Sequence, residues 1–311
     1  MTRNTIPMKR FNRREFVSAL SLGTGYLMFS NPITGCTNIS STDPFQVVKL
    51  GNSGLKTTML GMGCGVNGSM RTSFMTRQDK SKSLALVRHA YDAGVRFFDG
   101  ADLYGTHGII AEALQDIPRE NIMLSSKIWT REGGIPGTER PDADIVVDRF
   151  RKELKTDYID LMQIHCMVSS DWTETEKRQM DILSDLKAKG IIKAHGVSVH
   201  SWEAMKAAVE SPWVDVLHAR INPYGIMMDK PEPEEVISVI HKLHDSGKGV
   251  IGMKLVGGGT YVDDSDKIDK ALKFVLGLGS VDMIIVGFER NEQVGNYAER
   301  MRSALSDIKS A

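Results

Sequence analysis

Short apolar runs alternate with longer amphipathic segments along most of this 311-residue chain. The runs have the length of buried strands, and the segments between them repeat apolar residues at helical spacing. This pattern predicts eight strands, at residues 59–63, 95–98, 122–127, 159–165, 192–198, 214–221, 249–254 and 283–286. It predicts eight helices, at residues 77–93, 109–116, 142–154, 174–189, 202–210, 233–245, 266–276 and 292–305.

A turn-rich cluster, Gly51-Asn52-Ser53-Gly54, lies ahead of the first strand and predicts a β-hairpin over residues 47–60. Eight strand-then-helix units over roughly 250 residues predict an α/β fold, a (β/α)8 TIM barrel with this N-terminal β-hairpin. An open doubly wound sheet is the structural alternative. That fold usually has GxGxxG after its first strand, whereas GMGCGVNG lacks that spacing before a helix.

Four polar residues, Asp99, Tyr104, Lys127 and His165, lie at or just past the ends of three consecutive apolar runs. The carboxyl ends of barrel strands share one rim, so we expect these side chains to be neighbours. An acid, a phenol, an ammonium and an imidazole can together protonate a carbonyl while a hydride arrives. Each residue also has a structural interpretation, respectively a loop cap, a packed aromatic, an ion pair and a satisfied core histidine.

The segments that carry these residues are VRFFDGADLYG, NIMLSSKIW and LKTDYIDLMQIH. Together with KLGNSGLKTTMLGMGCG, GVS, MKLVGGG and VGFERNEQVGNY, they resemble the aldo-keto reductase family over nearly all of residues 47–305. The resemblance implies a nicotinamide-dependent oxidoreductase that interconverts a carbonyl and an alcohol. It also implies specific roles for the four polar residues.

By that resemblance Tyr104 is the general acid and His165 binds the substrate carbonyl. A tyrosine with an ordinary pKa of about 10 donates protons poorly at neutral pH. A nearby ammonium stabilises the phenolate, so we expect Lys127 to lower the pKa of Tyr104. Asp99 would keep Lys127 charged and oriented.

The resemblance also assigns a cofactor-binding set. Ser198 would touch the nicotinamide carboxamide and Tyr224 would stack on its ring, while residues 254–259 would form the pyrophosphate loop. The complete set is Ser198, Tyr224, Lys254, Leu255, Gly257, Gly258, Gly287, Glu289, Gln293 and Asn296. For Lys254, core packing or a salt bridge is the structural alternative.

Several positions depart from the family's habit. An asparagine commonly follows the serine, but this chain has Val199 and then His200. Residues 220–222 stand where a glutamine is common. Gln293 stands where a basic residue often binds the 2′-phosphate, although Arg290 could replace it and Glu289 would repel a phosphate. The family habit favours NADP(H) over NAD(H).

The composition limits the classes of partner and metal site that we expect. The chain has 39 basic and 39 acidic residues, so nothing predicts nucleic acid or an anionic membrane as a bulk electrostatic partner. Its three cysteines, Cys36, Cys64 and Cys166, have no zinc or iron–sulfur spacing, and no metal site is expected. Strand alternation predicts that Cys166 is a buried structural thiol pointing away from the pocket.

The first 36 residues predict an export signal. NRREFV is a twin-arginine motif, and the apolar stretch over residues 16–29 is too short to span a bilayer. Ile33-Thr34-Gly35-Cys36 resembles a lipoprotein processing box with Cys36 acylated, and ordinary cleavage nearby is the alternative. We therefore expect a signal peptide (1–36), a tether (37–46) and a barrel (47–311), in a periplasmic or membrane-anchored lipoprotein.

Twin-arginine export carries folded proteins, which favours a tightly bound cofactor loaded before export.

The predicted substrate walls are residues 67–77, 131–140 and 168–176, with Trp129 and Trp172 as stacking aromatics. The short C-terminal segment predicts an open pocket for a bulky or carbohydrate-like ligand. Two other functions remain open: a Schiff-base lyase that uses Lys127 or Lys254, and a dinucleotide-binding regulatory or sensor module with little turnover.

Overall fold

The computed structural model describes residues 41–230 and 232–311. Eight parallel strands form a closed barrel in the order β10-β3-β4-β5-β6-β7-β8-β9. The closed order confirms the predicted TIM barrel and excludes the open sheet. The barrel strands are β3 Leu60–Gly63, β4 Phe97–Asp99, β5 Met123–Ile128, β6 Ile159–Met167, β7 Ile192–Val199, β8 Val216–Arg220, β9 Gly249–Met253 and β10 Met283–Gly287.

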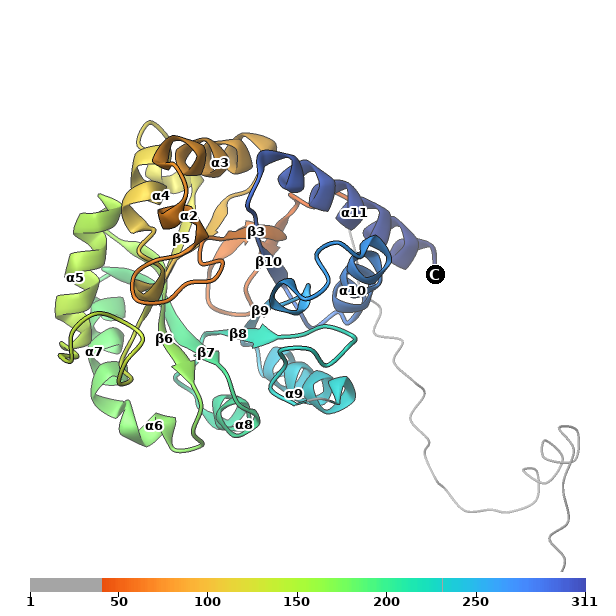
Figure 1. The fold of residues 1–311 in the computed structure, drawn as a ribbon. Coiled ribbons are helices and arrows are strands. Elements are labelled where there is room, and N and C mark those ends of the chain that lie inside the picture. Colours follow the sequence, from red (N-terminus) through yellow and green to blue (C-terminus); the bar gives the residue numbers. More distant parts are fainter. Residues whose placement is uncertain (1–40, 231) are drawn as a thin grey trace, which may run out of the picture. The chain divides into compact units, whose positions relative to one another are not determined.

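Helices surround the barrel, and Figure 1 shows them as an outer ring from α3 round to α11. They are α2 Phe74–Arg77, α3 Lys80–Ala93, α4 His107–Ala113, α5 Ala143–Leu154, α6 Trp172–Thr175, α7 Lys177–Ala188, α8 Trp202–Glu210, α9 Pro233–Asp245, α10 Ser265–Gly277 and α11 Asn291–Ser310. Short 3-10 turns add η1 Asp102–Tyr104, η2 Arg119–Asn121 and η3 Gly257–Gly259.

The predicted hairpin is present, with β1 Val47–Lys49 pairing antiparallel to β2 Lys56–Thr58. Its turn inserts Leu50 and Leu55 into an apolar cluster with strand residues such as Phe97 and Ile251. Asn52 N donates to Gly247 O just before β9, so the hairpin closes the amino end of the barrel. Apolar side chains fill that end, which leaves the carboxyl ends of the strands for polar groups.

The barrel strands are continuous apolar runs in the sequence, because both faces of the sheet are buried. Every residue of β5 and β6 is buried, as expected for parallel strands packed between a barrel interior and a ring of helices. A register shift between Ile164 and Met167 interrupts β6, and Cys166 there has a positive φ of 64°. This bulge lies directly after His165.

One predicted helix is divided in the structure. The single helix over residues 174–189 is two helices, because the chain breaks at Glu176, whose carboxylate accepts a hydrogen bond from Thr130 Oγ1 at 2.9 Å. Phe45, within the predicted tether, packs against the core beside Gly94. The predicted signal peptide and Cys36 lie outside the described residues. Within the described ranges, no helix combines the length and apolarity needed to cross a membrane.

Candidate active site

The four polar residues predicted to be neighbours meet at the carboxyl end of the barrel. They line one cleft with a volume of about 810 Å³. Lys127 Nζ donates to Asp99 Oδ1 at 2.5 Å and to Gly100 O at 3.0 Å. The same Nζ lies 5.5 Å from the centre of the Tyr104 ring, and the His165 ring meets Tyr104 edge-on at 5.6 Å. Their predicted proximity is confirmed.

Burial and pairing set the charges of this cluster. Burial alone would raise the pKa of Asp99, but Lys127 and then His218 hold that pKa below its usual range. Burial, and then the positive charge of Lys127, lower the pKa of His165 well below its ordinary value. At neutral pH the site therefore holds one buried ion pair beside a neutral imidazole.

The direction predicted for the pKa of Tyr104 is wrong. Burial, and then the negative charge of Asp99, raise the pKa of Tyr104 well above 10. Lys127 does not reverse this effect, because its ammonium is paired with Asp99 and faces the tyrosine ring. The phenol therefore stays protonated at neutral pH.

Two glycines of the loop after β3 make room for the Tyr104 ring. A Cβ atom on Gly65 would lie 2.3 Å from Tyr104 Cε2, and one on Gly68 would lie 2.4 Å from Tyr104 Cδ1. Real Cβ contacts are not this short, so any side chain at either position would displace the ring. The glycine-rich segment GMGCGVNG thus serves the packing of a tyrosine.

His218 on β8 was missed by the sequence analysis. It is fully buried, and its Nε2 lies 3.3 Å from Asp99 Oδ1, the oxygen that also accepts from Lys127. Burial lowers the pKa of His218, with Asp99 opposing that shift. The only sequence signal was a histidine inside an apolar strand, which is more often a core residue.

His200 and Met253 also line the cleft. Burial, and then the positive charges of Arg220 and Lys254, lower the pKa of His200 to about 3. His200 was noted only as a departure from the family, and Met253 was taken as part of a strand. Both lie where a predicted strand ends, which is the signal that could have identified them.

The cleft continues from the four polar residues to the loops after β9 and β10. Twelve of the fourteen predicted catalytic and cofactor-binding residues line it. They are Asp99, Tyr104, Lys127, His165, Ser198, Lys254, Leu255, Gly258, Gly287, Glu289, Gln293 and Asn296.

Gly257 and Tyr224 lie outside this lining. The Tyr224 ring packs edge-on against Tyr261 at 5.2 Å, and its hydroxyl donates to Lys267 O at 3.4 Å. In this conformation Tyr224 is engaged away from the cleft, so its stacking on a nicotinamide stays a prediction.

The loop after β9 has an unusual backbone. Lys254 has a φ of 63°, and Gly257, Gly258 and Gly259 have φ values of 59°, 66° and 105°. Left-handed glycines let a loop bring its backbone close to a ligand. Burial, and then Arg220, lower the pKa of Lys254, which has no acidic partner among the described residues. The structural alternative of a salt bridge is thus not found.

The loop after β10 uses Gln293 for its own fold. Gln293 Oε1 accepts from Glu289 N at 2.7 Å and from Arg290 N at 3.1 Å, which fixes the start of α11. Arg300 Nη1 pairs with Asp269 Oδ1 at 2.6 Å. Arg290 also lines the cleft, and no carboxylate of the described chain pairs with it.

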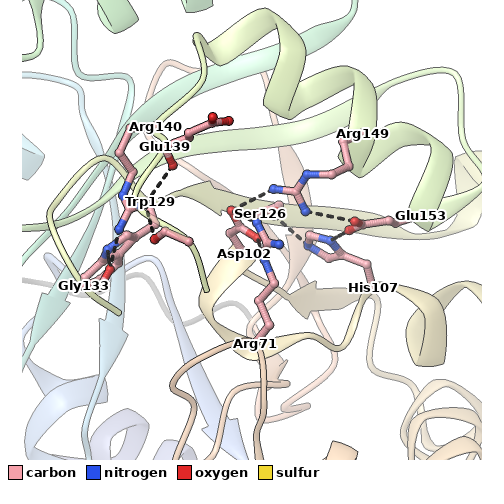
Figure 2. A network of polar contacts seen from close by, with 11 residues as sticks. Arg71, Asp102, His107, Ser126, Trp129, Gly133, Glu139, Arg140, Arg149 and Glu153 are labelled. Atoms are coloured by element: carbon pink, nitrogen blue, oxygen red, sulfur yellow. Dashed lines mark hydrogen bonds and ion pairs between the residues drawn. The ribbon is translucent and has the colours of Figure 1, made fainter. Parts of the chain in front are cut away.

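Two of the predicted substrate walls touch each other. Met70 N donates to Gly134 O at 2.7 Å, which joins residues 67–77 to residues 131–140. Figure 2 shows Arg140 holding the second loop, where it donates to carbonyl oxygens that include Gly133 O. Trp129 meets the His165 ring edge-on at 5.4 Å, so it lies beside the cluster of four polar residues.

The prediction that Trp172 is a stacking aromatic of the substrate wall is wrong. It is buried, and its Nε1 donates to Ala204 O at 3.1 Å. Cys166 is buried, as predicted, against Arg131 Nη1 at 3.3 Å. In the part of the chain that the structure describes, no group of three or more His, Cys, Asp or Glu side chains could hold a metal ion.

The structure thus places an Asp–Lys pair, a tyrosine and a histidine together at the carboxyl rim of a TIM barrel. The model of the aldo/keto reductase family matches residues 60–275, which is more than half of the chain. The chain belongs to the aldo/keto reductase family. The resemblance found in the sequence is thereby confirmed.

The probable aldo-keto reductase 1 of Glycine max is 29% identical over 171 residues, which cover 52% of this chain and 47% of that protein. The first curated relatives are thus matched over about half of their own length. The holo aldo-keto reductase AKR11C1 from Bacillus halodurans has a TM-score of 0.65 at 20% identity, covering 85% of this chain and 96% of that one. An aldo/keto reductase from Klebsiella pneumoniae, solved with NADP and acetate, has a TM-score of 0.63 at 16% identity, covering 85% and 94%. At these identities the solved structures support the fold.

Proposed function

We propose that this chain is an NADP(H)-dependent reductase that interconverts an aldehyde or ketone and its alcohol, with Tyr104 as the proton donor. The observation that carries the proposal is the cluster itself. Lys127, bound to Asp99 at 2.5 Å, faces the Tyr104 ring, and His165 lies edge-on to that ring in the same cleft. Family membership supports the reaction class.

Each residue has a chemical task in this proposal. Tyr104 holds a proton at neutral pH and would deliver it to the carbonyl oxygen as negative charge develops there. The Lys127 ammonium would stabilise the phenolate that remains, because a positive charge favours that form. His165 is neutral, so its ring can donate a hydrogen bond to the same oxygen.

The cleft fits a phosphate-bearing dinucleotide. Its volume of about 810 Å³ lies within the usual range for ligand pockets. Lys254 and Arg290 line it with no acidic partner among the described residues, and left-handed glycines form part of its wall. A bound nicotinamide would supply the hydride. Ser198 would hold its carboxamide, and Lys254 with Gly258 would hold the phosphates.

The direct test is isotope transfer. Purified protein is incubated with NADPH deuterated at C4 and a panel of aldehydes and ketones, and the product alcohols are analysed by mass spectrometry. Deuterium on the former carbonyl carbon supports the proposal. Tight NADPH binding with no transfer to any substrate would favour the binding-module alternative.

We assign the preference for NADP(H) to Arg290. The Gln293 side chain binds backbone N–H groups, so it is not free to bind a 2′-phosphate. Arg290, the basic residue closest to Gln293 along the chain, lines the cleft and could bind that phosphate instead. Arg290→Ala should raise the KM for NADPH at least about tenfold, because an ionic hydrogen bond is lost, and leave the KM for NADH nearly unchanged. Arg302→Ala, an exposed arginine of α11 outside the cleft, is the matched control. Equal effects on both cofactors would contradict this assignment.

One observation favours a second candidate. Lys254 is an unpaired lysine with a lowered pKa in the cleft, and such lysines can form Schiff bases. Lys127 is less suited because Asp99 binds its ammonium. Borohydride trapping of a carbonyl substrate on Lys254, found by peptide mass spectrometry, would support the lyase. Hydride turnover that survives in Lys254→Met would weigh against it.

We also propose that the protein is exported with its cofactor bound and is anchored through Cys36. The support is the twin-arginine motif and the lipoprotein box of the sequence. Protein isolated from the cell envelope should carry a diacylglyceryl group on Cys36 and a copurifying nucleotide, both visible by mass spectrometry. Envelope protein free of nucleotide would contradict the retained cofactor, and a cytoplasmic location would contradict export.

A further inference from the structure

A polar network surrounds the short turn that carries Tyr104. Asp102 lies two residues before Tyr104 in η1, and its carboxylate is buried. It accepts from Arg71 Nε at 2.7 Å and from Arg149 Nη2 at 2.7 Å. Figure 2 shows the carboxylate of Asp102 between these two guanidinium groups. One buried anion therefore joins the loop after β3 to helix α5.

The network continues from Arg149 toward β5, the strand that carries Lys127. Arg149 Nη1 donates to Glu153 Oε1 at 2.9 Å, and Glu153 Oε2 lies 2.7 Å from His107 Nδ1. His107 Nε2 lies 2.8 Å from Ser126 Oγ, and Ser126 directly precedes Lys127 on β5. The network thus starts two residues from Tyr104 and ends one residue from Lys127.

The Arg71 side of the network encloses Tyr104. The loop that ends in Arg71 presses Gly65 and Gly68 against the Tyr104 ring. The Arg71 carbonyl packs on Gly105, where an added Cβ atom would lie 2.0 Å from the oxygen. Arg71 itself has a left-handed φ of 56°, and its Nε lies 2.7 Å from Asp102 Oδ1. The loop therefore contacts the residues on both sides of the phenol.

None of these network residues lines the cleft. The Asp102 carboxylate is buried and bound by both arginines, so it is not available to touch a substrate or a cofactor. A buried ion pair is also weak support for stability, because desolvation offsets much of its Coulomb attraction. Geometry is the remaining role, since a displacement of about 1 Å at a reacting group can cost about 100-fold in rate.

We propose that Asp102 is a positioning residue, which with Arg71 and Arg149 fixes the Tyr104 phenol relative to Lys127. The inference rests on the proposed function, because it assigns a role around the proton donor. It also means that the substrate-side loop and the proton donor move as one unit.

Asp102→Asn tests this role, because it keeps the shape of the side chain and removes the charge shared by two arginines. The rate of hydride transfer in a single turnover should fall about 10- to 100-fold. The Kd for NADPH, measured by quenching of protein fluorescence, should change less than about twofold. The solvent deuterium isotope effect on that turnover should increase, because proton delivery from a displaced phenol becomes slower.

Arg119→Gln is the matched control. Arg119 Nη2 pairs with Asp160 Oδ2 at 2.6 Å near the start of β6, at the end of the barrel opposite the cleft. This variant should lower the Tm without changing the turnover rate or the isotope effect. A loss of rate in Arg119→Gln equal to that in Asp102→Asn would mean that the network acts only through stability.

Arg71→Gln is a second variant, should Asp102→Asn fail to fold, because the Arg71 side chain is partly exposed. It should reduce the turnover rate in the same direction, and Arg71→Lys should restore part of it. If the wild type transfers hydride and the folded variants have the same turnover rate, this inference alone is overturned. Wild-type protein that transfers no hydride would overturn the proposed function as well.

Discussion

The two ends of the cleft differ in how their side chains are held. At the proposed chemical end, Asp99 and Lys127 lie at paired strand positions set by the barrel register, and His165 lies on β6 beside its bulge. At the proposed cofactor end, the loops after β9 and β10 supply the lining groups, and Gln293 Oε1 accepts hydrogen bonds from backbone N–H groups of its own loop. The comparison teaches that the fold determines where strand-end side chains lie, whereas contacts within a loop determine where loop side chains lie.

The largest expected effect is at the chemical end. Lys127→Met leaves Asp99 buried without its cation, which should cost about 3–5 kcal/mol in the free energy of unfolding. Since phenolate stabilisation is lost as well, kcat should fall at least about 100-fold. Urea denaturation and steady-state kinetics measure the two effects.

Lys187→Met is the control for that variant, because Lys187 pairs with Asp215 at 2.5 Å but is partly exposed. It should cost no more than about 1 kcal/mol and leave kcat unchanged. A similar loss of activity in both variants would show that the strand-end pair has no special role.

Packing at the chemical end is the next target. Gly65→Ala places a Cβ atom against the Tyr104 ring, so kcat should fall about 100-fold through displacement of the phenol. Gly108→Ala in α4 adds a Cβ atom with nothing within 4 Å. It should raise stability by up to about 1 kcal/mol at unchanged kcat. A fully active Gly65→Ala enzyme would contradict tight placement of the ring.

His218 gives a smaller test of the same end. His218→Leu removes a group 3.3 Å from Asp99 Oδ1, so kcat should fall roughly tenfold, within the range for a lost contact to a charged group. His218→Gln retains a donor and should recover most of that loss. The pH profile of kcat is the readout, and an identical profile in His218→Leu would remove His218 from the site.

A test on stability rather than on kcat concerns His200, which lies between the two ends. Its folded pKa of about 3 lies below its ordinary value of 6.5, so below pH 6.5 the unfolded chain binds a proton that the folded protein does not. Stability therefore falls as the pH falls from about 6.5 toward 3. His200→Gln should reduce that slope by at most about 1.4 kcal/mol per pH unit, measured by denaturation at pH 4 to 7. An unchanged slope would contradict the burial of a neutral His200.

The same contrast explains what the sequence could predict. The eight strands and the proximity of the four candidate catalytic residues follow from apolar runs that end in polar groups, because a barrel brings the carboxyl ends of its strands to one rim. The packing of the Tyr224 ring on Tyr261 and the capping contacts of Gln293 did not follow, because apolar periodicity does not specify which partners a loop side chain contacts. The prediction for the pKa of Tyr104 was wrong for a related reason: burial raises that pKa, and Asp99, expected only to orient Lys127, raises it further by its negative charge.

The central claim is that Tyr104 delivers the proton while hydride reaches the carbonyl carbon. The direct measurement is a single turnover of NADPH with an excess of the best aldehyde, comparing wild type with Tyr104→Phe, which removes only the hydroxyl. The rate should fall about 100- to 10,000-fold, with NADPH binding retained. Equal rates in the two proteins would contradict the account.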